Sequence, residues 1–293
     1  MAANKALEII PTGNACGAEI RGIDLSQPIN EALFEQIFAA FAEHGILVLR
    51  NQDVPGPHQI AFSERFGELD IYVLSEYTLD EHPEILLISN IKENGRNIGL
   101  ADAGTTWHTD TSYLERPPLA TFLHAKELPI KDGKILGDTI FSSAAAAYDV
   151  LDADLKSKID GLAAVHSYYG KHEARAKLGR SDRVKPSEEE DKALQPVAHP
   201  IVRRHPITGR KALFIASGEC IGIPGMSDED ALPLIDQLAV HITKEEFHYR
   251  HQWREGDFII WDNSQLQHFA VRDYELPLRR LMYRTQVKGP IPA

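Results

Sequence analysis

Short apolar runs rich in β-forming residues follow one another from residue 84 almost to the C-terminus, and they constrain the fold more than any other feature. Each run has about the length of one strand, and turn-forming residues separate many of them. The runs are EILLIS, LATFLHA, DTIF, KALFIA, DFIIW and RRLMYRTQV. The chain has 293 residues, of which 43% are hydrophobic, enough for one large domain or two small ones. We therefore expect a β-rich core.

Helical patterns surround these runs. Residues 30–45 place apolar side chains at helical spacing, with Asn30 as the N-cap and Gly45 beyond the end. Other apolar patterns predict a buried strand and three more helices, at residues 46–50, 58–67, 143–161 and 228–242. The last two helices are expected to pack outside the strands. We predict a mobile insertion at about 165–196, and its highly charged part is either a lid or a solvated loop without a role.

The charge of the chain argues against nucleic acid as a partner. Its 43 acidic and 31 basic residues give a formal net charge of -12, which repels a phosphate backbone. No apolar run approaches the roughly 20 residues of a membrane span, and the N-terminal residues lack a secretory signal. Cys16 and Cys220 are too few for a disulfide framework or a cysteine-rich zinc site. We expect free thiols, no membrane partner and a cytoplasmic location.

The segment TTWHTDTSY, residues 105–113, carries His108 and Asp110 two positions apart. In an extended strand, positions i and i+2 share one face, so both side chains can reach one metal ion. A third ligand must come from elsewhere, and His268 is the candidate because it follows an apolar strand and a turn-forming DNS. Two histidines and a carboxylate form the facial triad of non-haem Fe(II), but zinc hydrolases use the same residue types. The residue types of the triad alone therefore do not decide which metal is bound.

The C-terminal strand "RRLMYR", residues 279–284, has an unusual face. The period of two places Arg280, Met282 and Arg284 on one side and Arg279 on the other. Arginine is rarely buried without a partner, and its planar guanidinium matches a carboxylate. The strand therefore indicates an anion site inside a barrel.

These motifs together carry a family resemblance. WHTD, a distal WDN followed by a histidine, and RRxMxR resemble the Fe(II)- and 2-oxoglutarate-dependent dioxygenases of the taurine dioxygenase and 2,4-dichlorophenoxyacetate dioxygenase family. The similarity extends over nearly the whole chain in GAEIRGIDLSQPI, ERFGEL, PPLATFLHAKELP, GDT, HPITGRKALF and GDFIIWDN. The resemblance implies a single α+β domain over residues 1–293, with a double-stranded β-helix (jelly-roll) core and surrounding helices.

The resemblance also implies an activity and its cofactors. The chain is expected to be a dioxygenase that uses Fe(II), 2-oxoglutarate and O2, and that releases succinate and carbon dioxide as it hydroxylates its substrate. The implied iron ligands are His108, Asp110 and His268. Arg280 and Thr139 match the residues that bind the far carboxylate of 2-oxoglutarate, with Arg279 as an alternative to Arg280. Because the family is usually oligomeric, the resemblance implies a homo-oligomer.

The substrate is less constrained. The positions that contact taurine in taurine dioxygenases fall near Tyr72, Ser75 and Gly104, which do not keep the same donors, so taurine is not expected. We expect a small anionic substrate, namely a sulfonate, a sulfate ester, an aryloxyalkanoate or another carboxylic acid. The residues expected to contact it are Arg284, Tyr72, Tyr113 and Thr106.

Two functions of other kinds remain open at this point. The first is a β-barrel metal-dependent hydrolase, in which Arg280 and Thr139 would have no 2-oxo acid to hold. The second is a non-catalytic ligand-binding protein, whose sequence mark would be the loss of a triad residue. All three triad residues are present.

Overall fold

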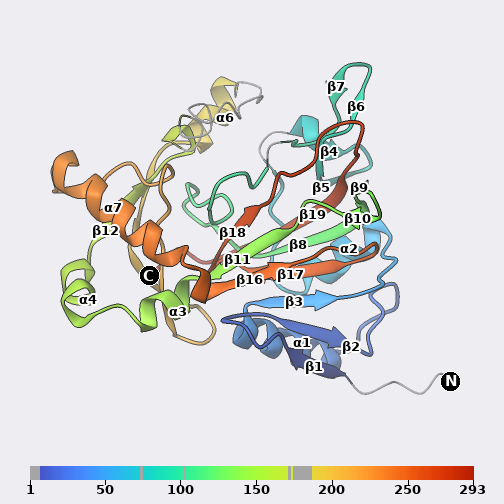
Figure 1. Cartoon of the computed structure of the whole chain (residues 1–293), viewed down its shortest axis with the longest axis horizontal. Helices are drawn as coiled ribbons and strands as arrows, with labels where there is room; N and C mark the ends of the chain where they lie inside the picture. Colours follow the sequence, from blue (N-terminus) through green and yellow to red (C-terminus); the bar gives the residue numbers. More distant parts are fainter. Residues whose placement is uncertain (1–6, 73–74, 102, 171–172, 174–186) are drawn as a thin grey trace.

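The computed structural model describes residues 7–72, 75–101, 103–170, 173 and 187–293 (Figure 1). It is a mixed α and β structure in which a large sheet packs against a small one. The large sheet has eight strands, in the order β1 (Glu8–Pro11), β2 (Ala18–Arg21), β3 (Ile46–Leu49), β17 (Phe258–Asp262), β8 (Pro118–Glu127), β19 (Leu281–Lys288), β5 (His82–Ser89) and β4 (Thr78–Leu79). The small sheet has three strands, in the order β16 (His248–His251), β11 (Thr139–Ser143) and β18 (Leu266–Ala270).

Short strand pairs and helices complete the described part of the chain. The pairs are β6 (Lys92–Glu93) with β7 (Arg96–Asn97), β9 (Ile130–Lys131) with β10 (Lys134–Ile135), β12 (Ala163–His166) with β13 (Val197–Pro200), and β14 (Val202–Arg204) with β15 (Lys211–Leu213). The helices are α1 (Glu31–His44), α2 (Gly56–Glu64), α3 (Ala144–Asp149), α4 (Ala153–Ile159), α6 (Glu188–Ala193) and α7 (Asp228–Ile242), with 3-10 turns η1 (Ser75–Tyr77) and η2 (Glu245–Phe247).

Apolar side chains of the two sheets meet in one core. Val48, Leu123 and Ile259 of the large sheet cluster with Phe141 and Leu266 of the small sheet, and all are buried. Alternate residues of the same strands point to the opposite face of the large sheet, where they pack against α1 and α2. The predicted β-rich core is confirmed, and the site described below opens between its strands.

Local sequence explains where α1 begins and ends. The Asn30 side chain accepts a hydrogen bond from the Leu33 N–H at 2.9 Å, and Gly45 ends the helix with a φ of 73°. The predicted helix at residues 228–242 is also confirmed, as α7, with Ser227 as its N-cap.

The helical pattern at residues 143–161 is confirmed, but the structure divides it into two helices. α3 ends at Asp149, and Asp152 begins α4 by accepting a hydrogen bond from the Leu155 N–H at 2.7 Å. An aspartate in mid-pattern offers the backbone an N-cap, and this cap competes with a continuous helix.

Besides the core between the sheets and the one under α1 and α2, a third hydrophobic core lies beside the two sheets. Helices α3, α4 and α7 pack there with β12 and β15 around Ile235 and Leu238 (Figure 1). The insertion expected at about 165–196 leaves this region after β12 and returns at β13. Its residues 171–172 and 174–186 lie outside the described part of the chain.

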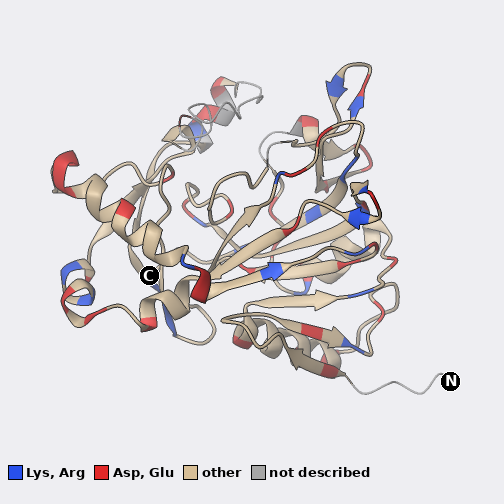
Figure 2. Ribbon diagram, in the orientation of Figure 1, with Lys and Arg blue, Asp and Glu red and all other residues tan. Residues whose placement is uncertain are grey.

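Residues of both charge signs are distributed over the helices, strands and loops (Figure 2). Of the helices in the described residues, none is both long enough and apolar enough to cross a bilayer. Cys16 and Cys220 are buried and form no disulfide, as predicted.

Candidate active site

The structure brings His108, Asp110 and His268 together. His108 and His268 form an isolated antiparallel bridge, in which the His108 N–H donates to the His268 carbonyl at 3.2 Å and the His268 N–H donates back at 2.9 Å. This bridge holds the loop of His108 beside β18. The expectation of an extended strand through His108 and Asp110 is wrong, because the chain turns at Asp110 and Thr111 follows with a φ of 38°.

The three side chains have a geometry that suits a metal ion. One ligand atom from each residue lies within 4.8 Å of the others, and all three residues are buried. The Asp110 Oδ1 atom lies 3.6 Å from His108 Nε2 and 3.8 Å from His268 Nε2. Metal–ligand bonds of about 2.0–2.2 Å allow one ion to reach all three atoms. The His108 Nδ1 atom lies 2.8 Å from the Thr106 carbonyl, which fixes the ring and leaves Nε2 to face the cluster.

The electrostatics of the cluster keep Asp110 ionised. Burial acts to raise the pKa of its carboxyl group, but the electrostatic interactions with His268 and Arg284 and the contact with His108 outweigh burial and hold the pKa well below its usual range. A deprotonated carboxylate is the form that binds a divalent metal.

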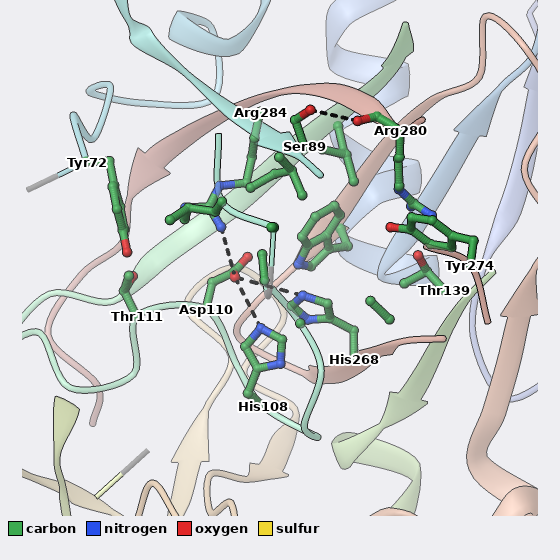
Figure 3. Close-up of a pocket in the computed structure, with 18 of the residues that line it drawn as sticks. Tyr72, Ser89, His108, Asp110, Thr111, Thr139, His268, Tyr274, Arg280 and Arg284 are labelled. Carbon is green, nitrogen blue, oxygen red and sulfur yellow. Dashed lines mark hydrogen bonds and ion pairs between the residues drawn. The ribbon is translucent and has the colours of Figure 1, made fainter. Parts of the chain in front are cut away.

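Arg280 lies at one end of the same pocket, next to Tyr274 and Thr139 (Figure 3). The residue is 4% exposed, its guanidinium donates to the Gly137 carbonyl, and the Trp253 and Tyr274 rings lie 5.5 and 5.7 Å from the guanidinium carbon. Burial lowers the pKa of Arg280, which is the expected effect on a cation taken out of water. Within the described residues, no ion pair joins Arg280 to an acidic side chain. A buried guanidinium of this kind suits an anionic ligand.

Thr139 lines the same pocket, and its hydroxyl accepts a hydrogen bond there. The Trp253 indole N–H donates to Thr139 Oγ1 at 3.1 Å. Since the indole can only donate, the Thr139 hydroxyl hydrogen remains available to a ligand that accepts it. The structure therefore places a cation and a hydroxyl donor in the same pocket, on the side of Arg280.

Arg284 lies on the other side of the cluster, with Tyr72 and Thr111 (Figure 3). Its Nη1 atom is 3.5 Å from Asp110 Oδ1, and its guanidinium carbon lies 5.6 Å from the centre of the Tyr72 ring. The alternation predicted for the last strand is confirmed, since Arg280, Met282 and Arg284 are buried whereas Arg279 is exposed and pairs with Glu127 at 3.1 Å.

The two remaining residues predicted to contact the substrate, Tyr113 and Thr106, differ in their position relative to the pocket. Tyr113 lines the pocket and packs edge-on against Tyr168. Thr106 is not among the lining residues, and its contact with the site is the carbonyl that lies beside the His108 ring.

Comparison with known sequences decides the family. Residues 8–286 match the family described as "Taurine catabolism dioxygenase TauD, TfdA family". The chain belongs to this family. It is thus a non-haem Fe(II)- and 2-oxoglutarate-dependent dioxygenase, with O2 as the second cosubstrate.

Individual relatives of the dioxygenase match over almost their whole length. The chain is 33% identical over 277 residues to the alpha-ketoglutarate-dependent 2,4-dichlorophenoxyacetate dioxygenase of Cupriavidus pinatubonensis, covering 91% of this chain and 92% of that protein. It is 32% identical over 295 residues to the alpha-ketoglutarate-dependent sulfate ester dioxygenase of Pseudomonas putida, covering 98% and 91%. The solved structure of AAD-2 in complex with Mn(II) and N-oxalylglycine superimposes with a TM-score of 0.80 at 28% identity, covering 98% and 99%.

Thr111 and Tyr274 are among the lining residues of the dioxygenase that sequence reasoning missed. A strand through Asp110 would point Thr111 away from the metal ligands, but the positive φ of Thr111 turns the chain so that its side chain lines the pocket. Tyr274 lies in the loop before β19, where no periodic pattern indicates which way a side chain points. The only available signal for Thr111 was its position next to a predicted ligand.

Proposed function

We propose that His108, Asp110 and His268 hold the Fe(II) of this dioxygenase. The observation that supports it best is their buried convergence, with three ligand atoms within 4.8 Å of one another. A triad on one side of the ion leaves positions for a 2-oxo acid and for oxygen. The bound iron supplies the oxygen activation that the reaction requires.

We further propose that Arg280 and Thr139 bind the far carboxylate of 2-oxoglutarate. The buried guanidinium and the directed hydroxyl both line the pocket on the side where Figure 3 places Tyr274. Arg279 is a poor alternative, because its side chain is 55% exposed and already paired with Glu127. The 2-oxo and adjacent carboxylate oxygens would then face the triad.

The substrate proposed for this enzyme is a small organic anion, hydroxylated with release of succinate and carbon dioxide. Two buried polar atoms of the pocket, Arg284 Nε and Thr111 Oγ1, have no hydrogen-bond partner among the described residues. An anionic head group would satisfy both. Tyr72 and Tyr113 would line the space around the substrate. The names of two relatives support an aryloxyalkanoate or a sulfate ester, and sulfonates and other carboxylic acids have the same head-group chemistry.

The body of the substrate is proposed to be apolar. Around Arg284, the pocket presents the side chains of Ile88, Leu100 and Leu123, and its only carboxylate among the described residues is Asp110. An ammonium group on the substrate would therefore lack an acidic partner among the described lining residues other than a proposed metal ligand. This composition favours aryloxy and alkyl acids over amino-substituted sulfonates.

Broader proposals on fold, domain organisation, location and assembly accompany this function. The two packed sheets form the double-stranded β-helix of a jelly roll, and residues 1–293 form one dioxygenase domain. The protein is expected to act in the cytoplasm as a homo-oligomer. The mobile insertion expected at about 165–196 stays a prediction, and its charged part is either a lid or a solvated loop.

Anaerobic addition of Fe(II) and 2-oxoglutarate tests the cofactor residues. A weak visible charge-transfer band should appear in the wild type and be absent in His108→Ala. Arg280→Leu should raise the 2-oxoglutarate concentration for half-maximal absorbance roughly 30-fold or more, because the loss of one partner of a buried charge pair costs about 2–5 kcal/mol. Arg279→Leu is the matched control and should leave this concentration unchanged. A band that responds to Arg279 instead would contradict the assignment.

Succinate release from a panel of aryloxyalkanoates, sulfate esters, alkylsulfonates and taurine tests the substrate class. Turnover is expected with members that have an apolar body, and taurine should be the poorest of them. Preference for taurine would overturn the proposed apolar subsite, and turnover of none of the anions would overturn the proposed substrate class.

A further inference from the structure

A group of buried polar residues that the family assignment does not use lies directly behind Asp110. Its centre is Thr121 of β8, which is fully buried. The register of the large sheet places Thr121 opposite Gln286 of β19, and Asn263 follows the end of the neighbouring strand β17. Three strands therefore bring polar side chains to one point next to a proposed metal ligand.

Every hydrogen bond of Thr121 has a defined direction. The side-chain oxygen of Asn263, Oδ1, accepts a hydrogen bond from the Asp110 backbone N–H at 3.3 Å. The side-chain nitrogen, Nδ2, therefore faces Thr121 Oγ1 at 2.9 Å. The Gln286 Nε2 atom also lies 2.9 Å from the same oxygen. Both amide nitrogens can only donate, and together they occupy the two lone pairs of the hydroxyl.

The hydroxyl hydrogen of Thr121 is therefore left for Asp110. Thr121 Oγ1 donates to Asp110 Oδ2 at 2.8 Å. The other carboxylate oxygen, Oδ1, is the atom that approaches His108 Nε2, His268 Nε2 and Arg284 Nη1. The two oxygens of the carboxylate thus have separate environments: one is held by the sheet and one faces the site.

We propose that Thr121, oriented by Asn263 and Gln286, is a positioning residue that makes Asp110 a one-oxygen ligand. The inference rests on the proposed role of Asp110 as a metal ligand. With Oδ2 engaged behind it, the carboxylate does not rotate to offer both oxygens to the ion. The coordination positions needed by the 2-oxo acid and oxygen are kept open in this way.

Metal binding without turnover tests the inference. Mn(II) is titrated into metal-free wild type, Thr121→Val and Thr121→Ser, and Kd is measured by calorimetry. Valine keeps the shape of threonine but removes the hydroxyl, and Kd should rise roughly 10- to 100-fold, which is the usual effect of losing a partner behind a metal ligand. Serine keeps the hydroxyl and should restore binding to near the wild-type value.

A matched control separates positioning from a loss of stability. Thr285 is a buried threonine of β19 whose hydroxyl lies 2.6 Å from Ser63 Oγ, away from Asp110. Thr285→Val removes a comparable buried hydroxyl and should lower Tm without changing the Kd for Mn(II). If Thr121→Val does not fold, Gln286→Met replaces it: this variant removes one of the two orienting donors, and a smaller rise in Kd is expected.

The outcomes are distinguishable. Equal Mn(II) affinity in wild type and folded Thr121→Val, or a weakening in Thr121→Ser as large as in the valine variant, would overturn the positioning role alone. Failure of the wild type itself to bind Mn(II) would overturn the proposed metal site and this inference with it.

Discussion

Gly137 is the residue on which the position of Arg280 depends most directly. It has a φ of 79°, and its carbonyl accepts a hydrogen bond from the Arg280 guanidinium. A Cβ atom at this position would collide with Arg280 Nη1 and would lie 2.7 Å from the Tyr274 ring. Gly137→Ala should therefore displace the guanidinium and raise the KM for 2-oxoglutarate by about 10-fold or more, because 1.4 kcal/mol of lost binding is a factor of ten.

Gly133 provides the control for backbone strain. Its φ of 74° is nearly the same, but nothing lies within 4 Å of the position of its Cβ atom. Both alanine variants carry the strain of a left-handed conformation, about 1–2 kcal/mol. Only Gly137→Ala should change the KM for 2-oxoglutarate in steady-state assays of both variants. Equal KM values for the two would show that the Gly137 contact does not position Arg280.

At the scale of elements, Phe141 of β11 connects the two sheets to the proposed metal site. Its ring is fully buried, lies opposite His268 in the register of β11 and β18, and stacks with that imidazole at 5.8 Å between centres. The centre of the Trp261 ring, on β17, lies 5.7 Å from the centre of the Phe141 ring. Phe141→Leu should lower the free energy of unfolding by about 1–2 kcal/mol. It should also weaken Mn(II) binding, because the His268 ring loses the aromatic ring that packs against it.

Phe41 of α1 is the matched position on the other face of the large sheet. It is also fully buried but belongs to the core that the helices cover. Phe41→Leu should cost similar stability in urea unfolding and leave the Kd for Mn(II) unchanged. A parallel loss of metal affinity in both variants would mean that the affinity follows global stability and not the contact with His268.

The same comparison of elements shows how far the sequence predicts the site. Residue types, spacing and a family resemblance identified five residues of the pocket, namely His108, Asp110, His268, Arg280 and Arg284. Burial also alternates in the last strand as predicted, with Arg280 and Arg284 on the buried side. Thr121 was not identified, because a threonine in a strand has an ordinary structural explanation. Its role depends on two amide donors from strands distant in sequence, a relation that arises only when the sheet forms. The break between α3 and α4 was likewise missed, since capping competes with helical periodicity too closely to decide from one sequence.

At the scale of the whole molecule, buried neutral histidines make stability depend on pH. His166 is the last residue of β12 and is fully buried, and burial lowers its pKa to about 3. His124 lies in the large sheet, and burial lowers its pKa to about 4. In the unfolded chain both would titrate near 6.5. Between about pH 4 and 6.5, the unfolded chain therefore binds protons that the folded chain does not, and stability falls as the pH is lowered.

Urea unfolding of the metal-free protein at pH 7.5, 5.5 and 4.5 should show this loss. Each of the two histidines contributes at most about 1.4 kcal/mol per pH unit below 6.5, until its folded-state pKa is reached. His166→Asn should reduce the dependence on pH, although it costs stability at pH 7.5 because the ring packs 4.6 Å from Phe214. The slope, and not the stability at one pH, is the diagnostic quantity, since a packing defect shifts all three measurements equally. An unchanged slope in His166→Asn would mean that His166 does not resist protonation in the folded protein, and acid sensitivity would then originate in other groups.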